Sequence, residues 1–119
     1  MDERILKWLF DIKLAIAEIE SYFEKEEKNF FKYKNNIMLK RAVERDLEII
    51  GEAMNRILKK DETFIKKIKE AKAIIGLRNQ VIHAYDSISD ENIWSVLISH
   101  LPKLKTEIEN LILNNNELK

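Results

Sequence analysis

Residues 5–23 read ILKWLFDIKLAIAEIESYF, and this stretch sets the fold class. Its large apolar side chains recur three or four positions apart, which is the spacing of one face of an α-helix and not the alternation of a strand. The stripe consists of Ile5, Trp8, Leu9, Ile12, Ile16, Ile19 and Phe23. We therefore predict a long amphipathic helix that buries this face in a core.

The rest of the chain follows the same pattern. Two glycines and one proline in 119 residues leave almost no turn chemistry for a β-fold. An aromatic-rich stretch at 30–36 interrupts the pattern, and a second helix is then predicted from about Ile37 to Leu58. Its inner face is made by Val43, Leu47, Ile50, Met54 and Ile57. We predict an all-α fold, a compact bundle of four to five helices in a single domain spanning residues 1–119.

Several residues predict where the later helices begin or bend. Asp61 can cap a third helix, and Ser89, followed by two acidic residues, can cap the last one. Pro102 lies inside that last helix, where it removes a backbone hydrogen bond, so we expect a kink near Ser99. The polar tail at 114–119 is expected to fray.

The two glycines each need a reason to lie among helical residues. Glycine inside a helix costs about 1 kcal/mol relative to alanine. For Gly51, in the second helix, we expect another helix to approach closely at this point. Gly76 is expected to mark a break or a tight contact after a third apolar stripe, made by Phe64, Ile65, Ile68, Ala71 and Ile75.

Composition excludes several classes of site. The chain has no cysteine and only two histidines, so it offers neither disulfides nor thiolate zinc sites, and a multi-histidine metal site within one chain is disfavoured. We predict no cofactor and no metal. No signal peptide and no membrane span are visible, which predicts a cytoplasmic protein with no membrane partner.

The balance of charged residues limits what the chain can bind. Basic and acidic residues number 21 each, and this balance argues against non-specific binding of nucleic acid through bulk charge. The segment KKIKEAK at 66–72 is the candidate for a local basic patch, although a solvated helix face is the alternative interpretation.

The stretch GLRNQVIHAYD, residues 76–86, concentrates polar groups on a helix that otherwise looks like core. Arg78 and His83 are five residues apart, so their directions diverge by about 140° on a regular helix. Asn79 lies one turn before His83 and could orient its imidazole. Because one helix does not pair these groups, a second copy facing the first would complete the site more easily, which favours a homodimer.

Histidine and arginine together suit phosphodiester cleavage. Histidine moves protons near neutral pH, and arginine holds phosphate and stabilises charge that grows on its oxygens. Such a pair could cleave RNA without a metal. Structural alternatives remain for each residue: Arg78 could pair with Glu44, Glu48 or Glu52, and His83 and Tyr85 could be ordinary packing residues.

GLRNQVIHAY resembles the Arg-x4-His-x-Tyr signature of the HEPN superfamily, in its HepT-like toxin branch. Residues 41–57, RAVERDLEIIGEAMNRI, and 93–108, IWSVLISHLPKLKTEI, are also similar to that branch. The resemblance implies a homodimeric helical bundle and a metal-independent endoribonuclease that is the toxin of a toxin–antitoxin pair, with RNA, such as tRNA, as substrate. It implies that Arg78 and His83 are catalytic, that Asn79 supports them, and that a minimal nucleotidyltransferase partner, MntA, silences the toxin by attaching AMP to Tyr85.

Two other functions remain open. The chain could be a non-catalytic module that presents nucleotide or substrate to a nucleotidyltransferase, with Arg78 and His83 gripping a phosphate without breaking it. It could also be a structural helical dimer, although a buried polar cluster must be offset by partners.

Overall fold

The helix predicted over residues 5–23 is helix α1, which spans Glu3–Tyr22 in a computed structural model. The structure describes residues 1–24, 28–83 and 89–117; for 78–83, 116 and 117 only the backbone is described. The other helices are α2 (Phe30–Lys34), α3 (Ile37–Lys60), α4 (Phe64–Lys67), α5 (Ala71–His83), α6 (Asp90–Ser95), the π-helical segment η1 (Val96–His100) and α7 (Leu101–Glu117). These residues contain no strand, so the all-α prediction is confirmed.

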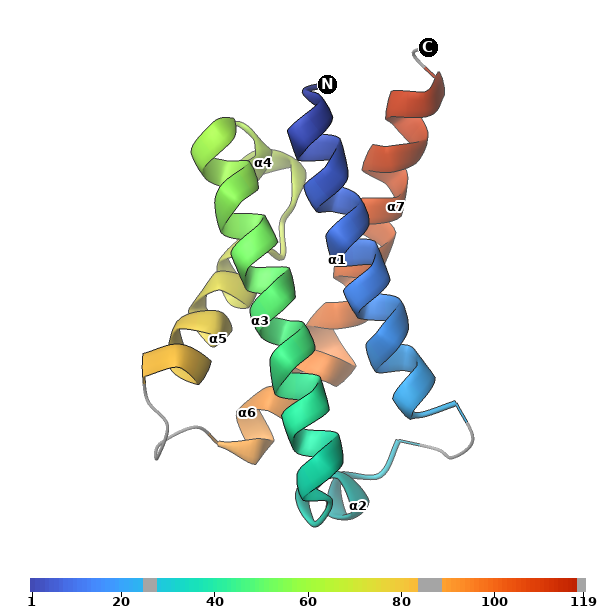
Figure 1. Cartoon of the computed structure of the whole chain (residues 1–119), viewed down its shortest axis with the longest axis vertical. Helices are drawn as coiled ribbons and strands as arrows, with labels where there is room; N and C mark the ends of the chain where they lie inside the picture. The colour runs from blue at the N-terminus through green and yellow to red at the C-terminus, as the bar shows by residue number, and fades with distance from the viewer. Residues whose placement is uncertain (25–27, 84–88, 118–119) are drawn as a thin grey trace.

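Four helical rods build the molecule: α1, α3, α5 and the continuous run of α6, η1 and α7. Helices α2 and α4 are short additions (Figure 1). Helix α1 packs against α3 and α7, and α5 packs on α3 and η1 at the side of the bundle. The thickness of 19 Å corresponds to two layers of helices, since one helix with its side chains is about 10 Å across. This arrangement agrees with the predicted bundle of four to five helices. None of the described helices is both long and apolar enough to cross a bilayer.

The predicted apolar stripes form the core. In α1, five of the seven stripe residues are fully buried, and Trp8 and Phe23 pack against them at the edge. All five residues predicted for the inner face of α3 are at most 1% exposed. The interruption at 30–36 is itself largely helical, because α2 inserts Tyr33 into the core beside Trp94, with 5.4 Å between the ring centroids.

The third predicted helix differs from the structure, which divides it into two. Helix α4 ends after one turn, and Ile68 has an extended backbone before α5 begins. The break resets the helical phase, so that Ile74 is buried and Ile75 is only partly buried. The expectation for Gly76 is wrong: it lies inside α5, is exposed, and a Cβ at this position would meet no atom within 4 Å in the part of the chain that the structure describes. Gly51 is buried in α3, and its predicted close contact stays a prediction.

Of the two predicted helix caps, only Ser89 is confirmed. The N-cap of α4 is Thr63, with no side-chain cap bond, and Asp61 instead ends α3 and accepts hydrogen bonds from the backbone N–H and the hydroxyl of Thr63. The Ser89 hydroxyl accepts from the backbone N–H of Asn92 and so caps α6.

The irregularity predicted near Ser99 takes the form of a π turn. Segment η1 covers Val96–His100 and joins α6 to α7 just before Pro102, whose missing N–H leaves the regular helical ladder incomplete. Beyond it, the predicted fraying of the tail is wrong as far as Glu117. Helix α7 continues to this residue because Asn115 is buried against the bundle.

A buried carboxyl group lies between α1 and α3. Asp46 is 2% exposed and accepts a hydrogen bond of 2.7 Å from the Tyr22 hydroxyl. Burial, together with the neighbouring Glu18, raises the pKa of Asp46 from 3.8 to about 6. The same hydrogen bond raises the pKa of Tyr22 to about 12. Compared with the unfolded chain, the folded bundle therefore favours the protonated form of Asp46.

We predict that Asp46→Asn stabilises the protein at neutral pH. Below about pH 4 the carboxyl is protonated in both the folded and the unfolded state; between about 4 and 6 only the unfolded state ionises, so folding stability is lost as pH rises. The neutral amide removes this loss, and we expect a gain of about 1–2 kcal/mol at pH 7.5 that vanishes near pH 4. Urea denaturation at both pH values measures it. Asp11→Asn, on the surface of α1, is the control, and an equal gain at both pH values would contradict the prediction.

Candidate functional site

The motif found in the sequence lies on one continuous helix. Positions 78, 79 and 83 all belong to α5, which ends at His83. Their side chains, and Tyr85 as a whole, lie outside the described residues. The structure therefore locates the backbone of Arg78, Asn79 and His83 and says nothing of contacts among the four predicted site residues.

The two sides of α5 differ sharply in exposure. Ala71, Ile74 and Leu77 are buried, whereas Lys72 and Gly76 are exposed. Position 78 is four residues after Ile74 and position 83 is seven after Gly76, so each lies on about the same side of the helix as that earlier residue. The helix thus presents the two predicted catalytic positions on different sides, as their spacing of five requires.

A carboxylate from α7 fixes the start of α5. Glu107 accepts hydrogen bonds from two consecutive backbone N–H groups, those of Lys69 (2.7 Å) and Glu70 (3.2 Å). We call this pair of bonds the Glu107 cap. An anionic acceptor at a helix start is favourable both as a hydrogen-bond partner and through the helix dipole.

A second contact from the same region lies beside the cap. His100 Nδ1, in η1, is 2.6 Å from Glu70 Oε2, and the Glu70 side chain is mostly buried. Together with the Glu107 cap, this contact ties the turn between α4 and α5 to the rod formed by η1 and α7. The residues just before the motif helix are therefore held by two contacts, one from η1 and one from α7.

The start of α6 is held by α3. Lys40 forms an ion pair of 3.0 Å with Asp90, and both side chains are only 18% exposed. Such a partly buried pair is screened less than a surface pair. It fixes the chain where it returns to the bundle after residues 84–88.

A groove of about 330 Å³ runs between α5 and the rod that follows it. We call it the α5–α6 groove. It is lined by Lys72, Ala73, Gly76, Leu77, Asn92, Ser95 and Val96. No carboxylate is among these residues, and Lys72 has no ion pair with any carboxylate that the structure describes.

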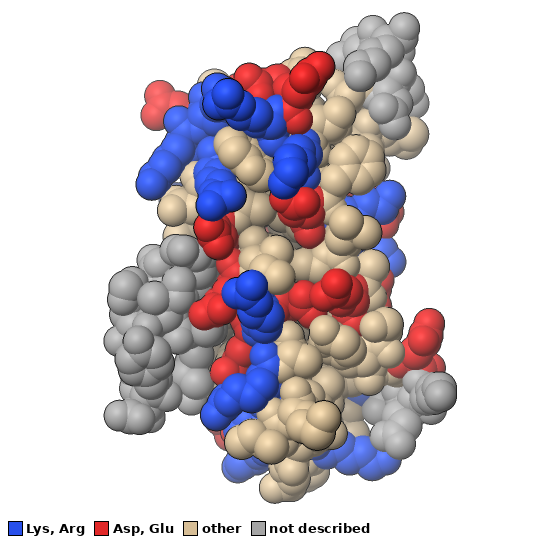
Figure 2. All heavy atoms as spheres, in the orientation of Figure 1, with Lys and Arg blue, Asp and Glu red and all other residues tan. Residues whose placement is uncertain are grey.

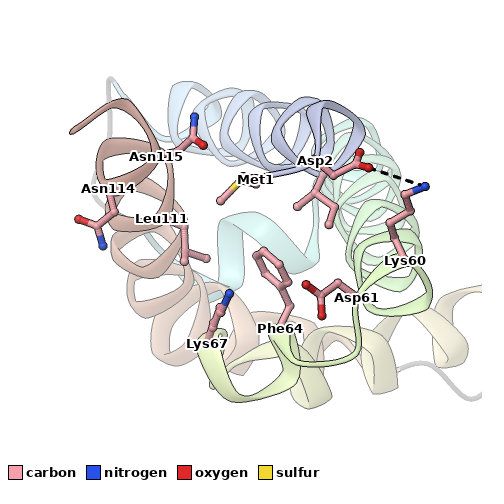
Figure 3. Close-up of a pocket in the computed structure, with 10 residues that line it drawn as sticks. Met1, Asp2, Lys60, Asp61, Phe64, Lys67, Leu111, Asn114 and Asn115 are labelled. Atoms are coloured by element: carbon pink, nitrogen blue, oxygen red, sulfur yellow. Dashed lines mark ion pairs between the residues drawn. The ribbon is translucent and has the colours of Figure 1, made fainter. Parts of the chain in front are cut away.

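A different hollow opens at the end of the bundle where the two termini meet α4 (Figure 3). It measures about 610 Å³, and the side chains of Met1 and Phe64 point into it. Its lining balances Lys60 and Lys67 against Asp2 and Asp61, which does not favour a polyanion. None of its lining residues comes from α5.

Surface charge is mixed. Basic side chains gather over the end of the bundle where α4 lies, with acidic side chains among them (Figure 2). The lysines of the segment 66–72 are exposed, as its interpretation as a solvated face requires. The three glutamates considered as partners of Arg78 each have an arginine of α3 nearby: Arg41–Glu44, Arg45–Glu48 and Arg56–Glu52.

The sequence did not reveal the residues that position α5. Glu107 is 38 residues from Lys69, and Glu70 is 30 residues from His100, so no local pattern links them. No three metal-binding side chains come together among the residues that the structure describes.

Comparison with known proteins places the chain among ribonuclease-like relatives. Residues 12–111 match the family described as "Ribonuclease HepT-like". The chain is 35% identical over 112 residues to "Putative RNase MJ1380" of Methanocaldococcus jannaschii, covering 92% of this chain and 98% of that protein. "Putative RNase MJ0125" of the same organism is 31% identical over 107 residues, covering 86% and 91%. No solved structure matches significantly.

We predict that Glu107→Ala loosens the start of α5 without unfolding the bundle. Losing the cap leaves two backbone N–H groups without their anionic acceptor, which should lower the free energy of unfolding by about 1–3 kcal/mol. Hydrogen exchange followed by NMR should show faster exchange at Lys69 and Glu70 than at Ile57 in α3. Glu109→Ala, exposed on the same helix, is the control. Unchanged exchange at both amides would remove the assigned role of the cap.

Proposed function

Because the chain belongs to the HepT-like ribonuclease family, we propose that it is a metal-independent endoribonuclease, a single domain over residues 1–119 that works as a homodimer. Arg78 and His83 are its catalytic residues, and Asn79 supports His83. The observation that carries this proposal is that positions 78, 79 and 83 lie on one continuous, anchored helix, with position 83 on about the same side as Gly76.

The proposed reaction is an internal displacement at phosphorus. His83 accepts the proton of the ribose 2′-hydroxyl, whose oxygen attacks the adjacent phosphate. A bond forms between this oxygen and phosphorus while the bond from phosphorus to the 5′-oxygen breaks. Arg78 stabilises the negative charge that builds on the non-bridging oxygens. The products are a 2′,3′-cyclic phosphate and a 5′-hydroxyl, formed once the leaving oxygen gains a proton.

The divergence of positions 78 and 83 supports a composite site. On one helix these positions point about 140° apart, so two copies related by a two-fold axis can bring one Arg78–His83 set opposite the other. A phosphate between the two helices would then meet groups from both protomers.

The biological role that we propose is that of a toxin. Its partner is a minimal nucleotidyltransferase of the MntA type, which transfers AMP to the Tyr85 hydroxyl. Tyr85 is two residues beyond His83 in the sequence, so the added phosphate would lie near the catalytic groups. It would compete with RNA for Arg78 and obstruct the cleft.

We predict that His83→Ala and Arg78→Ala each reduce cleavage of tRNA by about 10²–10⁴-fold, because proton transfer and charge stabilisation each contribute on this scale. Gel analysis with EDTA present measures the cleavage, and end-group analysis should find cyclic phosphates. Size-exclusion chromatography must show that the variants keep the oligomeric state of the wild-type protein. Binding of tRNA without cleavage by the wild-type protein would favour the non-catalytic module instead.

We predict that Tyr85→Phe still cleaves RNA but no longer accepts AMP, since only the hydroxyl that forms the phosphodiester is removed. Intact-mass spectrometry after incubation with ATP and the nucleotidyltransferase measures the transfer. Tyr22→Phe, at the end of α1, is the control and should be modified like the wild-type protein. Continued labelling of the Tyr85→Phe protein would show that the modified residue is a different one.

A further inference from the structure

The described residues give Gly76 no structural reason to be glycine. It lies in the middle of α5, its φ is not positive, and a Cβ there would meet no atom of the described residues within 4 Å. Alanine would stabilise the helix by about 1 kcal/mol. The glycine is nevertheless exposed in the floor of the α5–α6 groove. A strand that enters the groove from outside would explain the glycine, because a Cβ at position 76 would take up part of the space that the strand needs.

The chemistry of the groove suits an RNA backbone. Lys72 supplies one positive charge, and Asn92 and Ser95, both exposed, add neutral groups that can donate hydrogen bonds. Phosphate oxygens and ribose hydroxyls are met in proteins by this combination of a cation with hydroxyl and amide donors. None of the described lining residues is a carboxylate, so this part of the groove does not repel a phosphate.

The groove is also aligned with the proposed catalytic histidine. Positions 72, 76 and 83 lie on nearly the same side of α5, since 83 is seven residues after 76 and eleven after 72. At a rise of about 1.5 Å per residue, Gly76 lies about 10 Å and Lys72 about 16 Å along the helix axis from position 83. A strand that reaches His83 can therefore continue along the same helix side into the groove.

We propose that the α5–α6 groove binds the ribose-phosphate backbone of the RNA substrate next to the cleaved bond, with Lys72 on a phosphate and Gly76 providing room for the strand. This inference rests on the proposed ribonuclease function and assigns it a substrate-binding surface. A side chain at position 76 would stand in the floor of the groove and hold the backbone away from Lys72, Asn92 and Ser95.

The test compares stability with RNA affinity. Gly76→Ala and Gly76→Leu, each combined with His83→Ala to prevent cleavage, are titrated with fluorescein-labelled total tRNA. Both substitutions should raise the thermal midpoint, because alanine and leucine are strong helix formers. Affinity should fall in the order Gly, Ala, Leu, by about threefold and then more than tenfold, which corresponds to contacts of the size of single hydrogen bonds.

Lys72→Ala tests the charge. It should weaken tRNA binding and reduce the slope of log affinity against log salt concentration by about 0.7–0.9, the contribution of one neutralised phosphate. Lys66→Ala removes the same charge from α4, outside the groove. It should reduce the slope of log affinity against log salt concentration by less than Lys72→Ala does. Asn110→Ala, exposed on α7, is the control for added helix stability and should leave affinity unchanged.

The outcomes separate the two proposals. If the wild-type protein cleaves tRNA but position 76 and Lys72 variants bind it normally, the groove assignment is wrong and the ribonuclease function stands. If the wild-type protein neither binds nor cleaves tRNA, the proposed function itself fails. If Gly76→Leu instead dissociates a dimer in sedimentation velocity, the groove is a contact between copies, and the RNA assignment is overturned.

Discussion

The hydrogen bonds that Glu107 accepts from the backbone N–H groups of Lys69 and Glu70 are the constraint on which the motif helix depends. They decide where α5 starts, and the start of a helix fixes the direction of every residue after it. Ala71, Ile74 and Leu77 then face the core. The carboxylate that accepts these bonds belongs to α7. The orientation of the predicted site therefore depends on a residue that is 37 positions after Glu70 in the chain.

This anchoring gives α5 two different surfaces. One packs on α3, whose inner face is almost completely buried. The other borders the α5–α6 groove and carries Lys72 and Gly76. Because the chain has no formal net charge, binding of an anion depends on a few basic positions and not on the overall charge.

The sequence predicted what depends on local spacing. The stripes of α1 and α3, the cap at Ser89 and the irregularity before Pro102 all arise from residues within a few turns of one another. The break after α4 could not be predicted, because the group that stabilises it, Glu107, is distant in sequence. The expectation of a break or a tight contact at Gly76 is wrong because the helix break falls earlier, at Ile68, and Gly76 lies inside α5.

Local spacing also predicts only part of the candidate functional site. Spacing alone established that Arg78 and His83 diverge, but which side of α5 is buried depends on its contact with α3. The roles of the motif residues came from the family resemblance, and membership of that family is confirmed. The buried Asp46 had no signal in the sequence, since a charged residue in a helical stripe of α3 resembles its exposed neighbours until α1 covers it.

The π turn at Val96–His100 constrains how this chain can change in length. A π turn holds one residue more than an α-helical turn, so removing one would rotate α6 by about 100° relative to α7. Asn92 and Ser95 would then leave the wall beside α5, and Asp90 would move away from Lys40. Glu107, in α7, and His100, the last residue of the turn, contact Lys69 and Glu70 just before α5 and so hold α7 in place. Insertions and deletions in relatives that keep this geometry are therefore expected in the connections between rods and not in this five-residue segment.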